Sequence, residues 1–145
     1  MPPSASAASP EPGFWRVFAA APHRMMFLPG VLQTVMVMLF WLAELLGRLG
    51  WWPPLPLALA STPVHVFLML FGLFPFFIFG FLFTVYPRWM GGPVIPAPRY
   101  LVVFALLVSG MLLFYAGLFL SSLLVTAALI LLLAGWIAAL HALFT

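Results

Sequence analysis

Long apolar segments alternate along the chain with short segments rich in proline, tryptophan or charge. The apolar segments cover residues 25–46, 64–85, 101–120 and 123–143. A helix rises about 1.5 Å per residue, so each segment is long enough to cross a hydrocarbon core about 30 Å thick. The pattern predicts an all-α membrane protein in which four transmembrane helices form a bundle.

The second apolar segment has the clearest end. It is uncharged and rich in phenylalanine from Phe71 to Val85, and the sequence YPRW (86–89) follows directly. Aromatic and cationic residues of this kind are typical of a membrane–water boundary. Pro75 lies inside the segment. Because its ring lacks an N–H and clashes with the carbonyl group of Phe71, we expect a kink near the middle of the membrane.

Residues 100–145 form one apolar run that is too long for a single crossing. Ser121-Ser122, a polar pair near its middle, marks the predicted turn between the third and fourth helices. Small residues on one face of each helix would let the two backbones approach closely. These residues are Gly110 and Gly117 in the third helix and Ala134, Gly135, Ala138 and Ala142 in the fourth.

The N-terminal part differs in composition from the rest of the chain. Residues 1–13 have the proline, serine and alanine bias of a disordered tail. Residues 14–24 alternate aromatic, basic and small positions, which is typical of a segment lying in the headgroup layer. We therefore predict a disordered tail (1–13), an interfacial segment (14–24) and a single membrane domain (25–145).

Composition supports a membrane protein and excludes several functions. Of the 145 residues 66% are hydrophobic and 5% are charged, whereas a soluble domain has about 25% charged residues. The absence of cysteine excludes disulfides, thiolate metal sites and cysteine nucleophiles. The five basic residues are dispersed arginines that form no patch. We expect the lipid bilayer as partner, with further membrane helices or a second copy of the chain, and no nucleic acid.

The arginines predict the orientation in the membrane. Four crossings would place both termini and the loop after the second helix on one side. That side carries Arg16, Arg24, Arg88 and Arg99, whereas the other side carries Arg48. Positive charge is in excess on the cytoplasmic side of membrane proteins. We therefore expect a multi-pass protein of the bacterial cytoplasmic (inner) membrane with both termini in the cytoplasm.

Few side chains can carry chemistry inside the membrane. No ionisable residue falls near the midplane, which argues against a self-sufficient transporter, and no buried acid or histidine pair is available to a quinone-linked enzyme. His65 begins the second helix, either as a haem or copper ligand or as an interfacial residue at a helix start. Glu44 and Arg48 have the i, i+4 spacing of an ion pair; alternatively, Glu44 orients a ligating His65.

Three further residues are candidates for binding a cofactor at the opposite rim. His23 and His141 lie at the same depth, so they would form a bis-histidine site if the first and fourth helices are neighbours; otherwise they lie separately at the headgroups. Arg88 would bind an anion or a haem propionate, with Gly91 and Gly92 allowing close approach, or would only anchor the helix end. The residues alone leave both pairs of alternatives open.

Three segments match a known family. They are HVFLMLFG (65–72), GFLFTVYPRWMGGP (80–93) and the earlier APHRMMFL (21–28). The chain resembles the NnrS family, whose members carry His-x-His-Glu-Met-Leu-Phe-Gly, then Gly-Phe-Leu-Leu-Thr-x-x-Pro-x-Trp-x-Gly, and an earlier Pro-Phe-Arg. Motifs support the resemblance over residues 14–93, and hydropathy supports it over the rest.

The resemblance implies a polytopic membrane protein with haem and copper, linked to nitric oxide metabolism and to stress during denitrification. His65 matches the first histidine of the family motif, but Phe67 stands at the second histidine and Leu68 at the glutamate. Because both replacements remove ligand capacity, we predict that the isolated chain binds haem weakly or not at all. Family members are much longer, so the chain looks like the N-terminal part of one or a short relative.

Two functional hypotheses follow. The first is an NnrS-like membrane protein of the nitric oxide or nitrogen oxide response, with a metal site that a partner completes. The second is a cofactor-free membrane protein that acts as an interaction or assembly subunit. Neither requires that the chain itself is an enzyme. A Soret band in the purified protein would discriminate between them.

Overall fold

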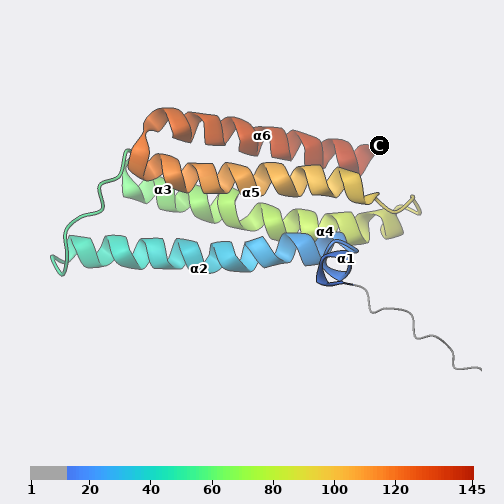
Figure 1. Cartoon of the computed structure of the whole chain (residues 1–145), viewed down its shortest axis with the longest axis horizontal. Helices are drawn as coiled ribbons and strands as arrows, with labels where there is room; N and C mark the ends of the chain where they lie inside the picture. The colour runs from blue at the N-terminus through green and yellow to red at the C-terminus, as the bar shows by residue number, and fades with distance from the viewer. Residues whose placement is uncertain (1–12) are drawn as a thin grey trace, which may run out of the picture.

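The computed structural model describes residues 13–145, and Figure 1 shows their helices. Nearly all of the predicted disordered tail falls outside the described residues. In chain order the elements are α1 (Phe14–Phe18), α2 (Pro22–Arg48), α3 (Ser61–Phe67), η1 (Leu68–Leu73, a π-helix), α4 (Phe74–Trp89), α5 (Ala97–Leu120) and α6 (Ser122–Phe144). The elements α3, η1 and α4 are continuous, so four helical rods are long and apolar enough to cross a membrane. The predicted all-α fold with four spans is confirmed.

Each rod is longer than the apolar segment that predicted it. Polar positions at the rims are helical too, and the rods cover 22–48, 61–89, 97–120 and 122–144. A helix satisfies its own backbone hydrogen bonds, so it does not have to end where the hydrocarbon ends. Local residues set the boundaries: Pro22 is the first residue of α2, and the Ser121 hydroxyl accepts a hydrogen bond from the Leu124 amide (3.4 Å) at the start of α6.

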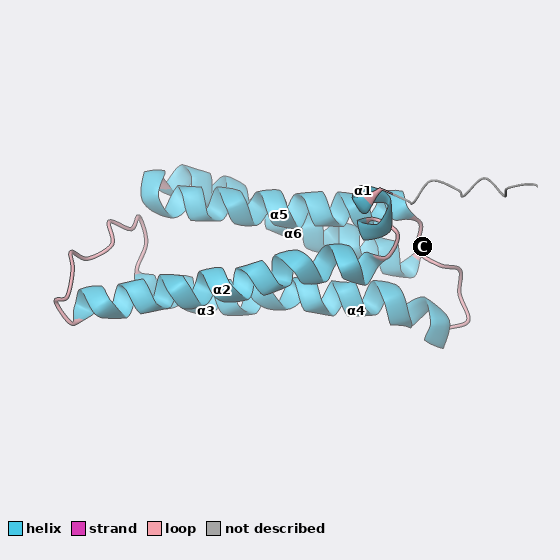
Figure 2. Cartoon of the chain, turned by 60° about the horizontal axis from the view of Figure 1, so that its bottom comes forward, coloured by secondary structure: helices cyan, strands magenta, loops and turns pink. Residues whose placement is uncertain are grey.

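The rods pair into two helical hairpins. The second rod packs along α2, and α6 packs along α5; Figure 2 shows the two pairs side by side. Glycines allow the close approach of α2 and α4. A Cβ added at Gly80 would lie 2.6 Å from the Phe27 ring, and one added at Gly30 would lie 3.1 Å from Phe76. Small residues are the usual means of close helix packing in membranes.

A regular seam joins α5 and α6. Its buried positions alternate spacings of three and four on both helices, as in a coiled coil. On α5 they include Tyr100, Val103, Leu107, Gly110, Phe114 and Gly117, and on α6 they are Val125, Ala128, Leu132, Gly135, Ala139 and Ala142. Of the predicted small residues, Gly110, Gly117, Gly135 and Ala142 lie in the seam, whereas Ala134 and Ala138 are only half-buried beside it. Because α6 is apolar around most of its circumference, its sequence does not show which side packs against α5.

The second rod departs from the α-helix just before Pro75, the position of the predicted kink. Residues Leu68–Leu73 are π-helical, and α4 then begins with Pro75 in its first turn. A π-helical turn shifts the hydrogen-bonding pattern by one residue, so the rod continues although proline lacks an N–H. Gly72 lies in this turn against α2. A Cβ added there would be 2.8 Å from Nε2 of Gln33.

Hydrogen bonds close both ends of the bundle. At one end the Tyr100 hydroxyl donates to the carbonyl of Ala19 (2.7 Å), which ties α5 to the turn before α2. At the other end the Ala58 amide donates to the carbonyl of Leu118 (2.7 Å). Figure 1 shows α1, the α4–α5 loop and the C-terminus together at the first end. We call it the arginine-rich end, because it holds Arg16 of α1, Arg24 in the first turn of α2, Arg88 near the end of α4 and Arg99 in the first turn of α5. We call the opposite end the Glu44 end.

Candidate functional site

At the Glu44 end, a polar network joins the end of α2 to the start of α3. Arg48 Nε donates to Glu44 Oε1 at 3.1 Å. Arg48 Nη2 donates to the hydroxyls of Ser61 (2.9 Å) and Thr62 (3.0 Å). The Ser61 hydroxyl donates to the same Glu44 oxygen at 2.6 Å. The predicted ion pair is confirmed. The Glu44 carboxylate accepts hydrogen bonds from Arg48 and Ser61 and none from His65, so Glu44 does not orient His65 in this structure.

His65 lies beside this network under an aromatic ring. Its imidazole stacks on the indole of Trp41, with 4.3 Å between ring centroids and 17° between planes. The Arg48 guanidinium also lies over the Trp41 ring, at 5.2 Å. The Nδ1 atom of His65 is buried without a hydrogen-bond partner. His65 is therefore held mainly by packing, and Met69, one turn further, packs against the core.

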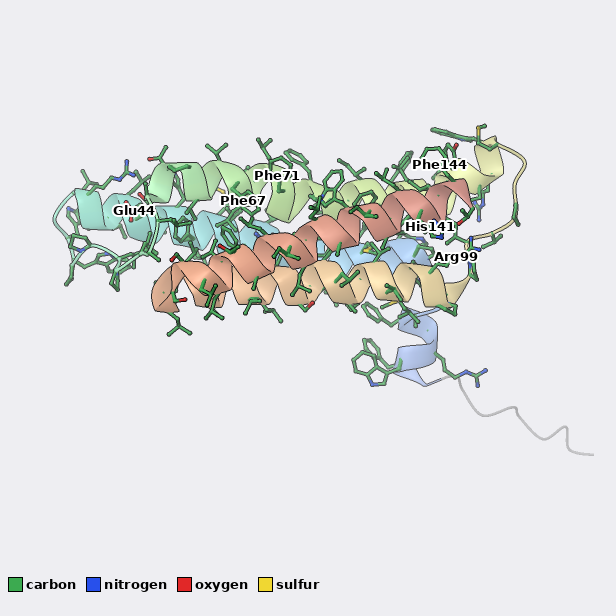
Figure 3. The ribbon with its side chains drawn as sticks, turned by 90° about the horizontal axis from the view of Figure 1, so that it is seen from above. Glu44, Phe67, Phe71, Arg99, His141 and Phe144 are labelled. Atoms are coloured by element: carbon green, nitrogen blue, oxygen red, sulfur yellow. The ribbon has the colours of Figure 1, made fainter. Side chains whose placement is uncertain are left out.

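Packing also fills the two positions at which the chain departs from the family motif. Phe67 stacks on Phe114 of α5 at 4.7 Å, and Leu68 is completely buried. Figure 3 shows Phe67 and Phe71 on the rod that runs beside α6. Residues two apart in a helix point to nearly opposite sides, so His65 faces α2 while Phe67 faces α5. These residues do not fit a haem bound between them.

At the arginine-rich end, the other two matching segments meet around one cavity of about 180 Å³. Residues of the turn before α2, the end of α4 and the following loop line it; among them are Pro22, His23, Thr84, Pro87 and Arg88. His23 Nδ1 lies 3.3 Å from the Thr84 hydroxyl, which itself donates to the carbonyl of Gly80 (2.8 Å). Because a hydroxyl has one proton, Nδ1 is the donor to Thr84. The Nε2 lone pair of the neutral ring is then free.

This cavity combines a cation with a hydrogen-bond acceptor. Arg88 supplies the fixed positive charge and His23 supplies the acceptor. Guanidinium groups bind oxyanions through paired N–H donors, and a volume of about 180 Å³ is below the 300–1,000 Å³ of sites for drug-sized ligands. The arrangement suits a small polar molecule or anion and is too small for haem.

His141 does not belong to this cavity. It lies on the exposed side of α6 and lines a separate surface cavity together with Arg99; Figure 3 shows both at the end of the bundle opposite Glu44. The helix that packs along α2 is α4 and not α6. The structure therefore does not bring His23 and His141 together, and the condition for a bis-histidine site is not met.

No group of three or more histidine or acidic side chains that would bind a metal ion occurs among residues 13–145. The histidine at the Glu44 end has no second histidine beside it, and the two at the arginine-rich end line different cavities. The side chains of the single described chain therefore do not fit the haem that the resemblance implies, at either end.

Three members of these sites were not predicted as such. Ser61 and Thr84 are small hydroxyl residues near helix ends, and Thr84 occupies a threonine position of the family motif, which was the available signal. Trp41 is an aromatic residue near the end of the first apolar segment. Its stacking on His65 depends on the pairing of α2 with α3, which the sequence pattern does not specify.

The described chain is thus a multi-pass helical membrane protein with polar clusters at both rims. A model of the family described as NnrS protein matches residues 17–144. The chain belongs to the NnrS family, and the match extends beyond the motif-bearing segments through α5 and α6. Comparison with curated proteins and with solved structures finds no match.

Proposed function

We propose that this chain acts in the cellular response to nitric oxide and related nitrogen oxides, in the bacterial cytoplasmic membrane with both termini in the cytoplasm. The observation that carries the proposal is the family match over residues 17–144. The excess of arginine at one end of the bundle supports the orientation.

The cavity that holds His23 and Arg88 is the site that we assign to this role. Two segments that resemble the family, far apart in the sequence, build it together. Arg88 would bind a small anion such as nitrite, and His23 Nε2 would accept a hydrogen bond from a water molecule bound beside the anion. This assignment takes the anion-binding alternative for Arg88 in preference to anchoring alone.

In this proposal, haem or copper is bound only when a partner supplies further ligands. His65 has a buried, unpaired Nδ1, but Phe67 and Leu68 supply no ligand beside it. A metal site at His65 would therefore be completed by another subunit or by further membrane helices. The four helices described here would not bind a stoichiometric haem by themselves.

Growth under nitric oxide tests the proposed role. In a bacterial strain that lacks the gene, the wild-type chain should restore growth in the presence of a nitric oxide donor. His23→Ala and Arg88→Ala should lose most of this restoration at equal protein level. His141→Ala is the matched control, because His141 lies at the same end outside the cavity, and it should restore growth fully.

The outcomes separate the parts of this proposal. Wild-type chain that gives no growth advantage contradicts the role in the nitric oxide response. If the wild type restores growth but His23→Ala and Arg88→Ala restore it equally well, the role stands and the assignment of the cavity is wrong.

A second function, a cofactor-free interaction or assembly subunit, is favoured by one observation. Phe67, at the position of the second histidine of the family motif, lines an apolar groove of about 410 Å³ between the second rod and α6. Its other lining residues are all apolar: Phe71, Leu129, Leu132, Leu133, Trp136, Ile137 and Leu140. A transmembrane helix of a partner protein would fit such a surface. Under this alternative, the chain purified together with its partner would show no Soret band.

A further inference from the structure

Another cavity lies at the level of the membrane core, between α2, α4 and α5. Its volume is about 300 Å³, and its lining is apolar except for the side chains of Gln33 and Tyr115. Three of its lining residues are also well exposed and face the lipid: Leu32 (58%), Met36 (48%) and Leu112 (66%). The cavity is therefore open to the bilayer on one side.

Both polar groups of this cavity lack a partner. The Gln33 side chain is 5% exposed and its Nε2 makes no hydrogen bond, and the buried hydroxyl of Tyr115 makes none either. The two side chains lie close enough to interact, but the Gln33 Nε2 atom and the Tyr115 hydroxyl do not meet the geometry of a hydrogen bond. An unpaired buried polar group costs about 1–3 kcal/mol. Both groups in this cavity are therefore available to pair with a ligand.

The surrounding backbone makes room for the Gln33 amide. Gly72 faces it, and a Cβ at that position would lie 2.8 Å from Nε2 and 2.9 Å from the methyl group of Met111. Gly72 belongs to the π-helical segment η1, and π-helical turns in longer helices occur frequently at functional sites. The π-helical turn and its glycine, which has no side chain, thus both lie next to the unpaired amide of Gln33.

The depth of the cavity restricts its ligand. Gln33 lies nine residues after Arg24 on one helix, which places it about 14 Å from the arginine-rich rim and near the middle of a hydrocarbon core about 30 Å thick. The ligand must be neutral and lipid-soluble. An amide N–H and a phenol O–H both donate hydrogen bonds, so the ligand must carry an acceptor. Acyl-ester carbonyls of phospholipids lie at the headgroup boundary, too shallow for this site.

We propose that the Gln33–Tyr115 cavity binds a lipid-soluble carbonyl compound of the quinone type. A ring carbonyl accepts hydrogen bonds from Gln33 Nε2 and from the Tyr115 hydroxyl, and the alkyl chain leaves through the lipid-facing opening. No charged residue and no histidine lines the cavity. The inference therefore concerns binding and not oxidation or reduction, and it does not depend on the function proposed above.

The chain offers an unusually direct reporter for this site. Gln33 is its one glutamine, and it contains no asparagine, so glutamine labelled with ¹⁵N at the side-chain amide gives signals from this site alone. With the protein in nanodiscs of ether-linked phospholipid, decylubiquinone should shift these signals in a saturable manner. Decylbenzene, which has a similar apolar body and no carbonyl, should not.

Variants test the two donors separately. Gln33→Leu should keep the fold, because it removes a buried group that is unpaired, and it should lower decylubiquinone affinity about tenfold. Tyr115→Phe should lower it about fivefold. Ser109→Ala and Thr34→Val are the matched controls, since each hydroxyl bonds the carbonyl four residues earlier in its own helix, and they should leave affinity unchanged.

Three results would overturn the proposal. The first is no shift of the Gln33 signals at a saturating membrane concentration of decylubiquinone. The second is an equal shift with decylbenzene, which would mean that the cavity does not recognise the carbonyl. The third is a shift on exchanging ether-linked for ester-linked phospholipid without quinone, which would assign the cavity to bilayer lipid.

Discussion

The substitution Gly117→Ala tests how tightly α5 and α6 are packed. A Cβ at this position would lie 2.7 Å from the backbone nitrogen of Val125 and 3.0 Å from the carbonyl carbon of Leu124. Ordinary van der Waals contact begins at 3.4 Å, so the closest contact is about 0.7 Å too short. Backbone atoms cannot rotate away as a side chain does. The two helices must therefore separate or tilt along the seam.

The expected cost follows from two opposing terms. Overpacking a tight contact costs about 1–3 kcal/mol, while replacing a helical glycine by alanine gains up to about 1 kcal/mol in helix propensity. We expect Gly117→Ala to lower the free energy of unfolding by about 1–2 kcal/mol. The assay is unfolding by SDS in mixed micelles, followed by far-ultraviolet circular dichroism.

Two other glycines make the test quantitative. Gly135→Ala meets only side-chain atoms of Leu107 within 3.1 Å, so a rotamer change relieves part of the overlap and a smaller loss is expected. Gly47→Ala, in the last turn of α2, meets nothing closer than 3.5 Å and should be neutral or slightly stabilising. If Gly117→Ala is as stable as Gly47→Ala, the close seam between α5 and α6 is not present in the membrane protein.

Three further predictions concern orientation, the rim network and the family motif. A reporter that is active only in the periplasm, fused after Thr145, should be inactive, and activity would contradict the cytoplasmic termini. Arg48→Gln should cost no more than about 1 kcal/mol of unfolding free energy, because partly exposed ion pairs contribute about 0–1 kcal/mol; a loss above 3 kcal/mol would mean that the network holds the bundle together. Phe67→His should not create haem binding in the purified chain, because the side chain at this position faces α5 and not His65; a new Soret band would contradict that geometry.

The sequence predicted those features that depend on local pattern. Apolar length located the four spans, the serine pair located the turn before α6, and the i, i+4 spacing of Glu44 and Arg48 predicted their ion pair. Each of these follows from residues close together in the chain. They did not require knowledge of which helices are neighbours.

The remaining features depend on helix pairing, which an apolar sequence does not reveal. In a bilayer the lipid-facing and packed sides of a helix are both apolar, so the seam of α6 could not be separated from its flank at Ala134. The bond between His23 and Thr84 requires that α2 lies against α4. Gln33 gave the only sequence signal for the cavity in the membrane core: one carboxamide in an apolar span.

The central claim is that the four helices do not complete a haem site by themselves. The most direct test is the haem content and visible spectrum of the purified monomeric 145-residue protein, expressed with sufficient haem. We predict no stoichiometric Soret band in the wild type and no change in the spectrum on His65→Ala. A stoichiometric low-spin haem in the monomer that survives His65→Ala and disappears with His23→Ala would contradict the account and place the haem at the arginine-rich end.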